Sequence, residues 1–277
     1  MVSHKHVRQI AKTAGFYALV ILVMLPTVFV FYWMITLSLK PQVEAAGYPP
    51  SFFRFTVTFK GYVEVFAKHP FLLYIWNSLV VAAGTTLLGL IVGLPAAYSI
   101  AQWKQQKLAL TILVARIIPG ISYLIPWYIL FRNIRMVDTY TALILTHLVV
   151  GLPITIWVMI GFFEDIPPDL REAALIDGCT DYGAFWRVAI PLVKPGVVAT
   201  AILAFIFSWN NFLFSVILAG RNARTLPIAV FNMIGYEEIN WGPLAAAATL
   251  ITLPVILLTL IIQRHIVSGL TFGAVKG

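Results

Sequence analysis

The sequence predicts an all-α membrane protein with six transmembrane helices and a helix-turn-helix segment in one of its loops. Its mean hydropathy is +0.90 and only 11% of its residues are charged, whereas a soluble globular domain is usually about a quarter charged. The apolar residues fall into six runs, each long enough to cross a bilayer core of about 30 Å as a helix. One polar segment, residues 167–191, interrupts this pattern and carries its own helix signals.

The net charge and the single cysteine say less about function. A charge of +8 could indicate nucleic-acid binding, but the Lys and Arg residues are spread among short loops and form no basic stripe or arm. We interpret them as anchors at the membrane surface. Cys179 has no second cysteine to pair with, so we expect a small packing residue there.

Taken in order, the chain begins with a basic leader, residues 1–15. The apolar run that follows is too long, and too poorly matched to a small-residue cleavage site, to be a removed signal peptide. After it, the polar and proline-rich segment 38–70 predicts an ordered external loop. The predicted spans are 16–37, 72–101, 108–131, 140–163, 196–218 and 244–262.

Prolines lie inside five of these six spans. Each one frees a backbone carbonyl, which a membrane tolerates only where neighbours or water satisfy it. Interrupted helices are common where transporters move or bind, but proline is also simply frequent in membrane helices, so both explanations stay open. Gly89 and Gly93 form a GxxxG pair, which favours close packing of two helices.

The first half of the polar segment has the signals of a helix start. Pro167 and Pro168 stop the preceding helix and Asp169 can cap a new one. Glu172 follows three residues later, which is the spacing of a capping box. The new helix is predicted to carry an apolar stripe of Leu170, Ala173, Ala174 and Ile176.

The second half predicts a turn and another helix. Gly178 supplies the left-handed residue that ends the first helix. Thr180 or Asp181 can cap the second helix, which is expected to run through Val188 and to end at Pro191.

With these residues in place, the segment resembles the EAA loop of ABC-importer permeases, which matches at Glu172, Ala173, Ala174, Gly178 and the IPL at 190–192. The resemblance implies a cytoplasmic coupling helix that docks into a cleft on an ATPase subunit, so that closure of the ATPase dimer around ATP tilts the membrane helices. The residues implied in coupling are Leu170, Arg171, Glu172, Ala173, Ala174, Asp177, Gly178 and Pro191. The plainer interpretation is an amphipathic helix on the membrane surface.

A second match lies in the fifth span, SWNNFLF at 208–214. It is similar to a segment of carbohydrate-type ABC permeases that often reads WNxF. Amides suit sugar hydroxyls and an indole face suits the sugar ring, so we expect Trp209, Asn210 and Asn211 to line a substrate path. The alternative is that the amides tie helices together and the tryptophan packs.

Other polar side chains also lie at membrane depth, where burial is costly unless they are paired or hydrated. Arg116 and Tyr123 in the third span are further candidates for the path, although Arg116 could equally reach up to the membrane surface. His147 is better explained by a hydrogen bond between helices than by a metal, since no second His or acid stands at metal-ligand spacing. Asn77 and Ser78 resemble an NS pair of the family and are assigned no ligand role.

The C-terminus gives a third match. GLTFGAVKG at 269–277 resembles the GLTxGxVKG that ends the shorter permease subunit of maltose-type importers. In that relative the tail reaches between the two ATPase subunits, which implies the same role for Gly273, Val275, Lys276 and Gly277. The loop at 219–243 corresponds there to a loop that probes the substrate-binding protein.

Charge alone orients the chain only weakly. With a cytoplasmic N-terminus, ten Lys and Arg residues fall on inner segments and eight on outer ones, a small excess for the positive-inside rule. The EAA resemblance requires its loop in the cytoplasm and so implies that both termini are cytoplasmic. The expected organisation is a basic N-terminus (1–15), a six-span permease domain (16–265) with external loops at 38–70 and 219–243 and the coupling loop at 167–191, and a cytoplasmic tail (266–277).

The resemblance thus implies a permease subunit of an ATP-driven ABC importer for a sugar or sugar derivative, in the inner membrane of a bacterium. Its implied partners are a second homologous permease, two ATPase subunits and an extracytoplasmic substrate-binding protein, with no nucleic acid. We expect no cofactor on this chain, because ATP and Mg would bind the ATPase subunits. We also expect no enzymatic activity, because the GxxxxG at 84–89 is followed by Leu90 where a Walker A motif needs Lys.

Two other classes fit the sequence less well. An ion-coupled secondary transporter would place acids or histidines at membrane depth, but all eleven acids lie in loops or at span ends. An intramembrane enzyme would need paired catalytic groups, and neither HExxH nor GxSxG occurs in the sequence. The sequence does not identify the sugar.

Overall fold

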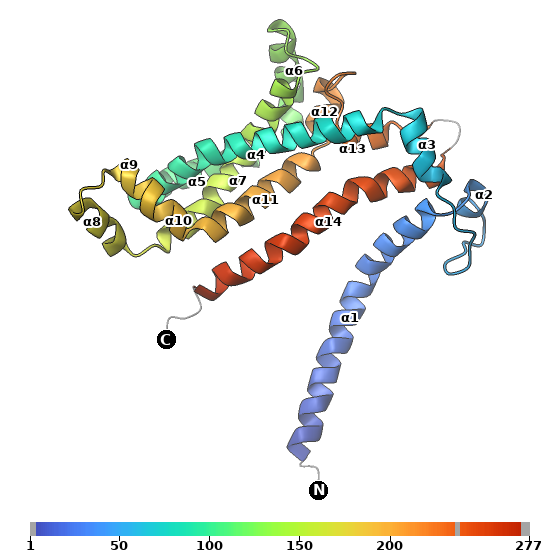
Figure 1. The fold of residues 1–277 in the computed structure, drawn as a ribbon, viewed down its shortest axis with the longest axis horizontal. Coiled ribbons are helices and arrows are strands. Elements are labelled where there is room, and N and C mark those ends of the chain that lie inside the picture. The colour runs from blue at the N-terminus through green and yellow to red at the C-terminus, as the bar shows by residue number, and fades with distance from the viewer. Residues whose placement is uncertain (1–3, 236–238, 273–277) are drawn as a thin grey trace. The chain divides into compact units, whose positions relative to one another are not determined.

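The computed structural model describes residues 4–235 and 239–272, with side chains described at residue 9, from 12 to 235 and from 239 to 263. Every element in those residues is helical (Figure 1), which confirms the predicted all-α class. The chain divides into two compact units, Met1–His69 with Met233–Leu250, and Pro70–Asn232 with Ile251–Gly277. They are called unit 1 and unit 2 and are described one at a time.

Unit 1 is dominated by one long apolar helix. Its α1 side chains between Phe16 and Phe31 are mostly exposed, and a helix that is apolar on all sides is stable in lipid rather than in water. The elements of unit 1 are α1 (His4–Ser38), α2 (Gln42–Ala45), α3 (Lys60–Lys68) and the first part of α14 (Trp241–Phe272).

The segment after α1 is organised around a buried lysine. The Lys40 ammonium donates a hydrogen bond to the carbonyl of Ser51. It also lies 4.3 Å from the ring centre of Trp33 and 4.9 Å from that of Phe55. Cation–π contacts of this kind strengthen when the cation is shielded from water, so the loop is held against the end of α1.

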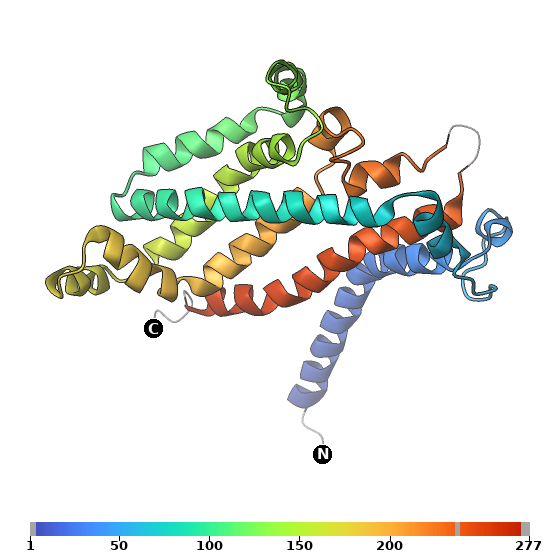
Figure 2. The ribbon, with the colours of Figure 1, turned by 45° about the horizontal axis from the view of Figure 1, so that its top comes forward.

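Unit 2 contains a bundle of three long helices. In both views α4, α7 and α11 lie side by side, with α8 to α10 at one end and α6, α12 and α13 toward the other (Figures 1 and 2). Its elements are α4 (Phe71–Gln102), α5 (Gln106–Val114), η1 (Ala115–Ile117), η2 (Gly120–Tyr123), α6 (Leu124–Asn133), α7 (Tyr140–Glu164), α8 (Pro168–Ile176), α9 (Asp181–Ala184), η3 (Phe185–Ala189), α10 (Ile190–Leu192), α11 (Lys194–Trp209), α12 (Leu213–Leu218), α13 (Leu226–Phe231) and the remainder of α14.

Close packing of α4 on α7 depends on the predicted GxxxG pair. A Cβ added at Gly93 would lie 2.9 Å from Cγ2 of Thr155, and one at Gly89 would touch Leu148 at 3.6 Å. A larger residue at Gly93 would require the Thr155 side chain to move, whereas Gly89 is at an ordinary contact distance, and both glycines face α7, as expected of a pair that holds two helices together.

Four helices are long and apolar enough to cross a membrane without interruption within the described residues: Lys12–Ser38, Phe71–Gln102, Tyr140–Glu164 and Trp241–Gln263. Two further candidates are pairs of helices bent by 80°, Gln106–Ile117 with Gly120–Asn133 and Asp181–Leu192 with Lys194–Trp209. Counting each bent pair as one span gives six, the predicted number, but the second pair joins α11 to the Asp181–Leu192 part of the polar segment and not to the rest of the predicted span 196–218.

The third predicted span, 108–131, is not one continuous helix. Ile118 and Pro119 are extended, with ψ of 120° and 133°, between the 3-10 turns η1 and η2. Proline has no N–H to donate and disfavours helical conformation in the residue before it. The helix therefore stops at Ile118 and resumes in a new direction.

The fifth predicted span, 196–218, is also divided. Its first helix, α11, ends at Trp209, and α12 starts only at Leu213. The side-chain oxygen of Asn211 accepts a hydrogen bond from the backbone N–H of Phe214 at 3.4 Å. Asn competes in this way with the helical hydrogen bonds, so the two amides mark a break where a continuous span was expected.

Candidate functional site

The polar segment folds as two short helices and a turn, but its first helix starts differently from the prediction. α8 begins at Pro168, and Pro167 before it makes no side-chain capping bond. Asp169 lies inside the first turn, so the predicted capping box with Glu172 is wrong. Pro168 suits the first helical position because its backbone is already in helical geometry and the N–H that it lacks would have no partner.

The turn after α8 forms as predicted. Gly178 has φ of +86°, a conformation that side chains other than glycine rarely adopt. The N–H groups of Cys179 and Gly178 donate to the carbonyls of Ala174 and Leu175 at 2.9 and 3.1 Å. These two bonds form a Schellman motif, which satisfies the last carbonyls of α8.

The second helix is capped by Thr180 and ends later than predicted. The Thr180 hydroxyl accepts a hydrogen bond from the N–H of Gly183 at 3.1 Å. The helical path then continues through the π-helix η3 and α10 as far as Leu192. Pro191 does not end it, because it stands in the first turn of α10, where a proline costs little.

Arg171 ties the two helices of the loop together. Its guanidinium donates to the carboxylate of Asp181 at the start of α9 and lies 6.0 Å from the ring of Trp103 at the end of α4. Its side chain is only 22% exposed, whereas that of Asp181 is 65% exposed. Arg171 therefore fixes α8 against α9 from inside the loop.

One face of the loop is buried in the bundle. The Phe185 ring lies 5.0 Å from that of Tyr98 on α4 and 6.2 Å from that of Phe163 on α7. Phe185, Ala189 and Val193 share a single buried cluster with residues of α4, α5 and α7. This side of the loop is therefore packed directly against α4, α5 and α7.

Several apolar side chains of the loop are exposed. Ile176 is 85% exposed, Tyr182 72%, Trp186 48% and Leu170 41%. Glu172 is also exposed, and among the described side chains it has no hydrogen-bond or ion-pair partner. Exposed apolar side chains grouped in this way mark a surface on which something else packs.

The candidate path residues of the third span lie around its break. Arg116, in η1, is partly buried, and its guanidinium lies 5.8 Å from the ring of Phe207 on α11. The Tyr123 hydroxyl donates to the carbonyl of Ile118 at 2.9 Å, so it satisfies one of the backbone groups that the break frees. The structure thus places both at an interrupted helix.

The candidates of the fifth span have separate environments. Trp209 is 2% exposed, stacks on Phe205 and donates from its indole nitrogen to the carbonyl of Ile251 at 3.0 Å. That is the packing role weighed as the alternative for this residue. Asn210 is exposed and Asn211 is half-buried at the break between α11 and α12.

His147 behaves as expected from its isolation in the sequence. Its Nδ1 lies 2.8 Å from the hydroxyl of Ser208, so the hydrogen bond joins α7 to α11. Within the part of the chain that the structure describes, no three His, Cys, Asp or Glu side chains stand close enough to hold a metal ion.

Sequence reasoning missed a carboxylate that holds the loop after α12. Asp138, which precedes α7, accepts from the N–H groups of Gly220, Asn222 and Ala223 at 2.7 to 3.1 Å, and from the side-chain amide of Asn222 at 2.9 Å. Burial opposes ionisation, but these backbone and side-chain donors outweigh it and hold the pKa of Asp138 below its usual value.

The NS pair at the start of α4 fixes the same loop from the other side. The amide nitrogen of Asn77 donates to the carbonyls of Asn222 and Arg224 at 2.9 and 2.8 Å. The Ser78 hydroxyl accepts from the N–H of Leu226 at 2.8 Å, and the Tyr140 hydroxyl donates to Asn77 at 2.7 Å. The only hint in the sequence was polar residues at the very start of two spans.

The predicted tail contacts lie outside the described residues, namely Gly273, Val275, Lys276 and Gly277. The central part of the predicted 219–243 loop, residues 236–238, lies outside them as well.

Comparisons with known proteins agree on one family. Residues 70–272 match the family described as "Binding-protein-dependent transport system inner membrane component". Among curated relatives, "Trehalose transport system permease protein SugB" of Mycobacterium tuberculosis is 40% identical over 253 residues, which cover 88% of this chain and 91% of the relative. "Sulfoquinovosyl glycerol transport system permease protein SmoH" of Agrobacterium fabrum is 36% identical over 249 residues, 88% of this chain and 87% of the relative.

A solved structure has the same fold. A chain of a bacterial ABC transporter "involved in the import of the acidic polysaccharide alginate" superposes with a TM-score of 0.76 at 17% identity, over 95% of this chain and 98% of the other.

Proposed function

Because the chain belongs to the family of binding-protein-dependent inner-membrane transport components, we propose that it is the permease subunit of an ATP-driven ABC importer for a sugar or sugar derivative. It would form half of the translocation path. The observation that carries the proposal is the match, over about nine tenths of both chains, with permeases named for trehalose and for sulfoquinovosyl glycerol. Neither the family nor these relatives support the ion-coupled alternative.

A single permease subunit needs partners to work. We infer a second homologous permease, two ATPase subunits and an extracytoplasmic substrate-binding protein. ATP and Mg would bind the ATPase subunits, so this chain would be a non-catalytic subunit without a cofactor. It would lie in the inner membrane of a bacterium, with both termini and the loop at 167–191 in the cytoplasm.

The exposed face of that loop is our candidate for the ATPase contact. Ile176 and Tyr182 are more than two thirds exposed on short helices outside the long apolar spans. Glu172 stands beside them with its carboxylate free of partners among the described residues, and we propose an ATPase arginine as its counterion. A charge-assisted pair in the middle of an apolar contact gives a docked helix its orientation.

Through its buried face, the loop would transmit movement to α4 and α7. Phe185 and Val193 pack in one cluster with Ala97 of α4 and Met159 of α7. Tightly packed side chains move together rather than deforming, so a displacement of α8 by a closing ATPase dimer would tilt α4 and α7. Alternating access of the path would follow from that tilt.

The breaks in α5–α6 and α11–α12 support a path near them. An interrupted helix is tolerated at membrane depth where it lines a cavity or is covered by protein. Asn210 is exposed at one break and Arg116 lies at the other, so we retain both as proposed lining residues. Asn211 and Tyr123 would line the path beside them, whereas Trp209 would support it from behind.

The first experiment is affinity purification of the chain from its native membrane, followed by identification of the co-purifying proteins and an ATPase assay with trehalose, maltose and sulfoquinovosyl glycerol. Recovery of a second permease, an ATPase and a binding protein, with hydrolysis stimulated by one of these sugars or by a related one, is the expected result. A homo-oligomer that hydrolyses no ATP would overturn the assignment.

Glu172→Lys tests the coupling role in the same assay. We expect normal membrane insertion and at least about a tenfold loss of sugar uptake, since the reversed charge would face a cation across a partly desolvated contact. Glu172→Gln should lose less. A charge-reversal control is Glu64→Lys on α3 of unit 1, which breaks only the partly exposed pair of Glu64 with Lys68 and should leave uptake unchanged. Normal uptake by Glu172→Lys would contradict the proposed coupling role of this loop.

A further inference from the structure

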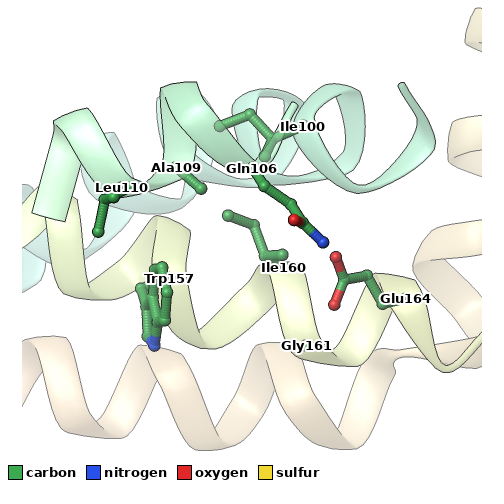
Figure 3. A pocket seen from close by; sticks show the side chains of 8 residues that line it. All are labelled: Ile100, Gln106, Ala109, Leu110, Trp157, Ile160, Gly161 and Glu164. Carbon is green, nitrogen blue, oxygen red and sulfur yellow. The ribbon is translucent and has the colours of Figure 1, made fainter. Parts of the chain in front are cut away.

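A pocket of about 420 Å³ opens between the end of α4, α5 and the end of α7 (Figure 3). Its volume is in the range of small-molecule sites. Ile100, Ala109 and Ile160 form an apolar wall, and Gly161 leaves open space, since a Cβ built there has no atom within 4 Å. The coupling and path residues described above are not part of this lining.

The pocket has one polar side. The side chains of Gln106 and Glu164 point toward each other at this side (Figure 3). Both residues are exposed, and neither side chain has a hydrogen-bond or ion-pair partner among the side chains that the structure describes. The end of the Gln106 amide that faces Glu164 in Figure 3 carries the nitrogen, so the Glu164 carboxylate is the acceptor at this opening, and it favours a ligand that brings N–H donors or a positive charge.

Polarity changes with depth along α7. Glu164 ends the helix, and Trp157 lies seven residues earlier, which is about 10 Å deeper in the span at 1.5 Å per residue. Trp157 and Leu110 line the deeper part and are about half exposed. A polar rim at the span end and an apolar interior below it fit an amphiphile that stands in the membrane with its head at the surface.

Two basic residues are close in sequence to Gln106 at this rim. Lys104 and Lys107 are exposed, one in the turn before α5 and one directly after Gln106. A carboxylate with lysines close by complements a headgroup that has both an ammonium and a phosphate. An anionic headgroup without an amine would leave Glu164 unpaired and would be repelled by it.

From this arrangement we propose that the pocket binds a phospholipid with a primary ammonium headgroup, of the phosphatidylethanolamine type. The ammonium donates to the carboxylate of Glu164, and the phosphate meets Lys107 and the amide nitrogen of Gln106. One acyl chain lies along Leu110 and Trp157. A primary ammonium is required because a quaternary one has no N–H to donate.

The pocket is also connected to the coupling loop, because residues of both pack in one buried cluster. Ile100, Ala109 and Ile160 belong to the same buried cluster as Phe185 and Val193, so a bound lipid packs against the core that carries the loop. Occupancy therefore stiffens the connection between the loop and α7. This consequence rests on the proposed function, whereas the binding itself does not.

Native mass spectrometry of the purified complex, incubated with equal amounts of phosphatidylethanolamine, phosphatidylcholine and phosphatidylglycerol, tests the binding. We expect at least about a tenfold preference for phosphatidylethanolamine over both others. Glu164→Gln should reduce this preference to less than about twofold. The matched control Asp165→Asn removes the neighbouring exposed acid, which does not line the pocket, and should keep the preference.

Gly161→Leu tests the pocket by filling it. The added side chain enters open space, so the variant should assemble and melt like the parent while it loses retained phosphatidylethanolamine. Equal binding of the three lipids, an equal effect of Asp165→Asn and Glu164→Gln, or full lipid retention by a correctly assembled Gly161→Leu complex would each overturn the proposal.

A second arm separates this proposal from the proposed function. In nanodiscs of phosphatidylethanolamine, sugar-stimulated ATPase activity should be at least about twofold higher than in phosphatidylcholine, and Glu164→Gln should remove that difference. Selective lipid binding without any sugar-stimulated hydrolysis would refute the importer assignment and leave the lipid site intact. Sugar-stimulated hydrolysis without selective lipid binding would refute the lipid site and leave the importer assignment intact.

Discussion

Two polar loops at opposite ends of the unit 2 bundle are built in contrasting ways. The loop of α8 to α10 buries Phe185 but leaves other large apolar side chains outside, so that Ile176 is 85% exposed. In the loop at 219–226, Ala223 and Leu226 are each 1% exposed. There the backbone N–H groups and carbonyls are bound by Asp138 and Asn77.

The difference separates two uses of a loop in a membrane protein. Where the hydrogen-bonding groups of a loop are bound by other residues of the same chain, the conformation of the loop is fixed before any partner binds. A partner then meets a rigid surface. Where the apolar side chains remain outside, the loop is complete only when another surface covers them. We therefore expect substitutions in the first loop to change association, and substitutions around the second to change local stability.

The largest effect should come from Ile176→Asp. An isoleucine buried at an interface contributes about 1.5–3 kcal/mol, and an aspartate adds the cost of an unpaired charge. We expect the ATPase subunits to bind at least about 100-fold more weakly, measured by titration of the purified permease pair with the ATPase. Ile176→Leu should be nearly neutral.

The comparison predicts that Arg221→Asp, in the other loop, leaves ATPase affinity unchanged. If Arg221→Asp weakened the ATPase as much as Ile176→Asp does, the outward face of α8 would not be the docking surface.

The second-largest effect should come from Asp138→Ala, which should release the loop at 219–226. We call this loop the anchored loop, because Asp138 and Asn77 hold it. Hydrogen bonds to a charged acceptor contribute about 1.5–3 kcal/mol each, and this carboxylate accepts several. Tryptic cleavage after Arg221, which is exposed, should become at least about tenfold faster, because the segment must leave its anchors to enter the protease. Asp138→Asn keeps one acceptor oxygen and should lie between the two.

The control for this cleavage is Asp165→Ala, which removes an acid with no side-chain bond among the described residues. Unchanged cleavage in Asp138→Ala would mean that Asn77 and Ser78 alone hold the loop.

These two loops also differ in how far the sequence predicts them. The turn at Gly178 and the cap at Thr180 are local, since each depends on residues within five positions; the turn was predicted, and Thr180 was one of two predicted caps. The bonds of Asp138 join residues that are 82 to 85 positions apart, and no periodicity or spacing in one sequence reveals such a pair. What the sequence offered was only an acid and an NS pair at span starts.

Hydrophobicity predicted the class and the number of spans but not their breaks. The six apolar runs have the right length, yet a hydropathy average cannot distinguish one straight helix from two bent ones. The prolines did not distinguish the breaks, because Pro119 lies at one break while Pro26, Pro95, Pro153 and Pro254 lie inside continuous helices. The break near Asn211 depends on a side chain that takes over a backbone bond. The capping box failed for a similar reason, because Pro168 can start a helix without any cap.

A smaller effect should appear when the anchored loop is acidified. The pKa of Asp138 is lowered from 3.8 in the folded protein, so its contribution to stability is complete above that value and is lost as the pH falls through the lower folded pKa. Amide exchange at Gly220, Asn222 and Ala223, corrected for intrinsic rates, should be constant from pH 6 to about 4 and should rise below it.

Asp138→Asn should remove this acid step, because it has no carboxyl to protonate. If the parent and Asp138→Asn showed the same rise in amide exchange at low pH, another titrating group would cause it.

The smallest effect should come from Asp181→Asn. It removes the ion pair with Arg171, but the carboxylate is 65% exposed, and pairs of that kind are typically worth about 0.2–1 kcal/mol. We expect sugar-stimulated ATPase activity to fall by less than about threefold, against the far larger loss expected for Ile176→Asp. The reason is that the Schellman turn and the burial of Phe185 still hold α8 and α9 in place. A loss as large as that of Ile176→Asp would mean that the outward face depends on this one pair for its orientation, and the loop would then be a hinge rather than a rigid docking surface.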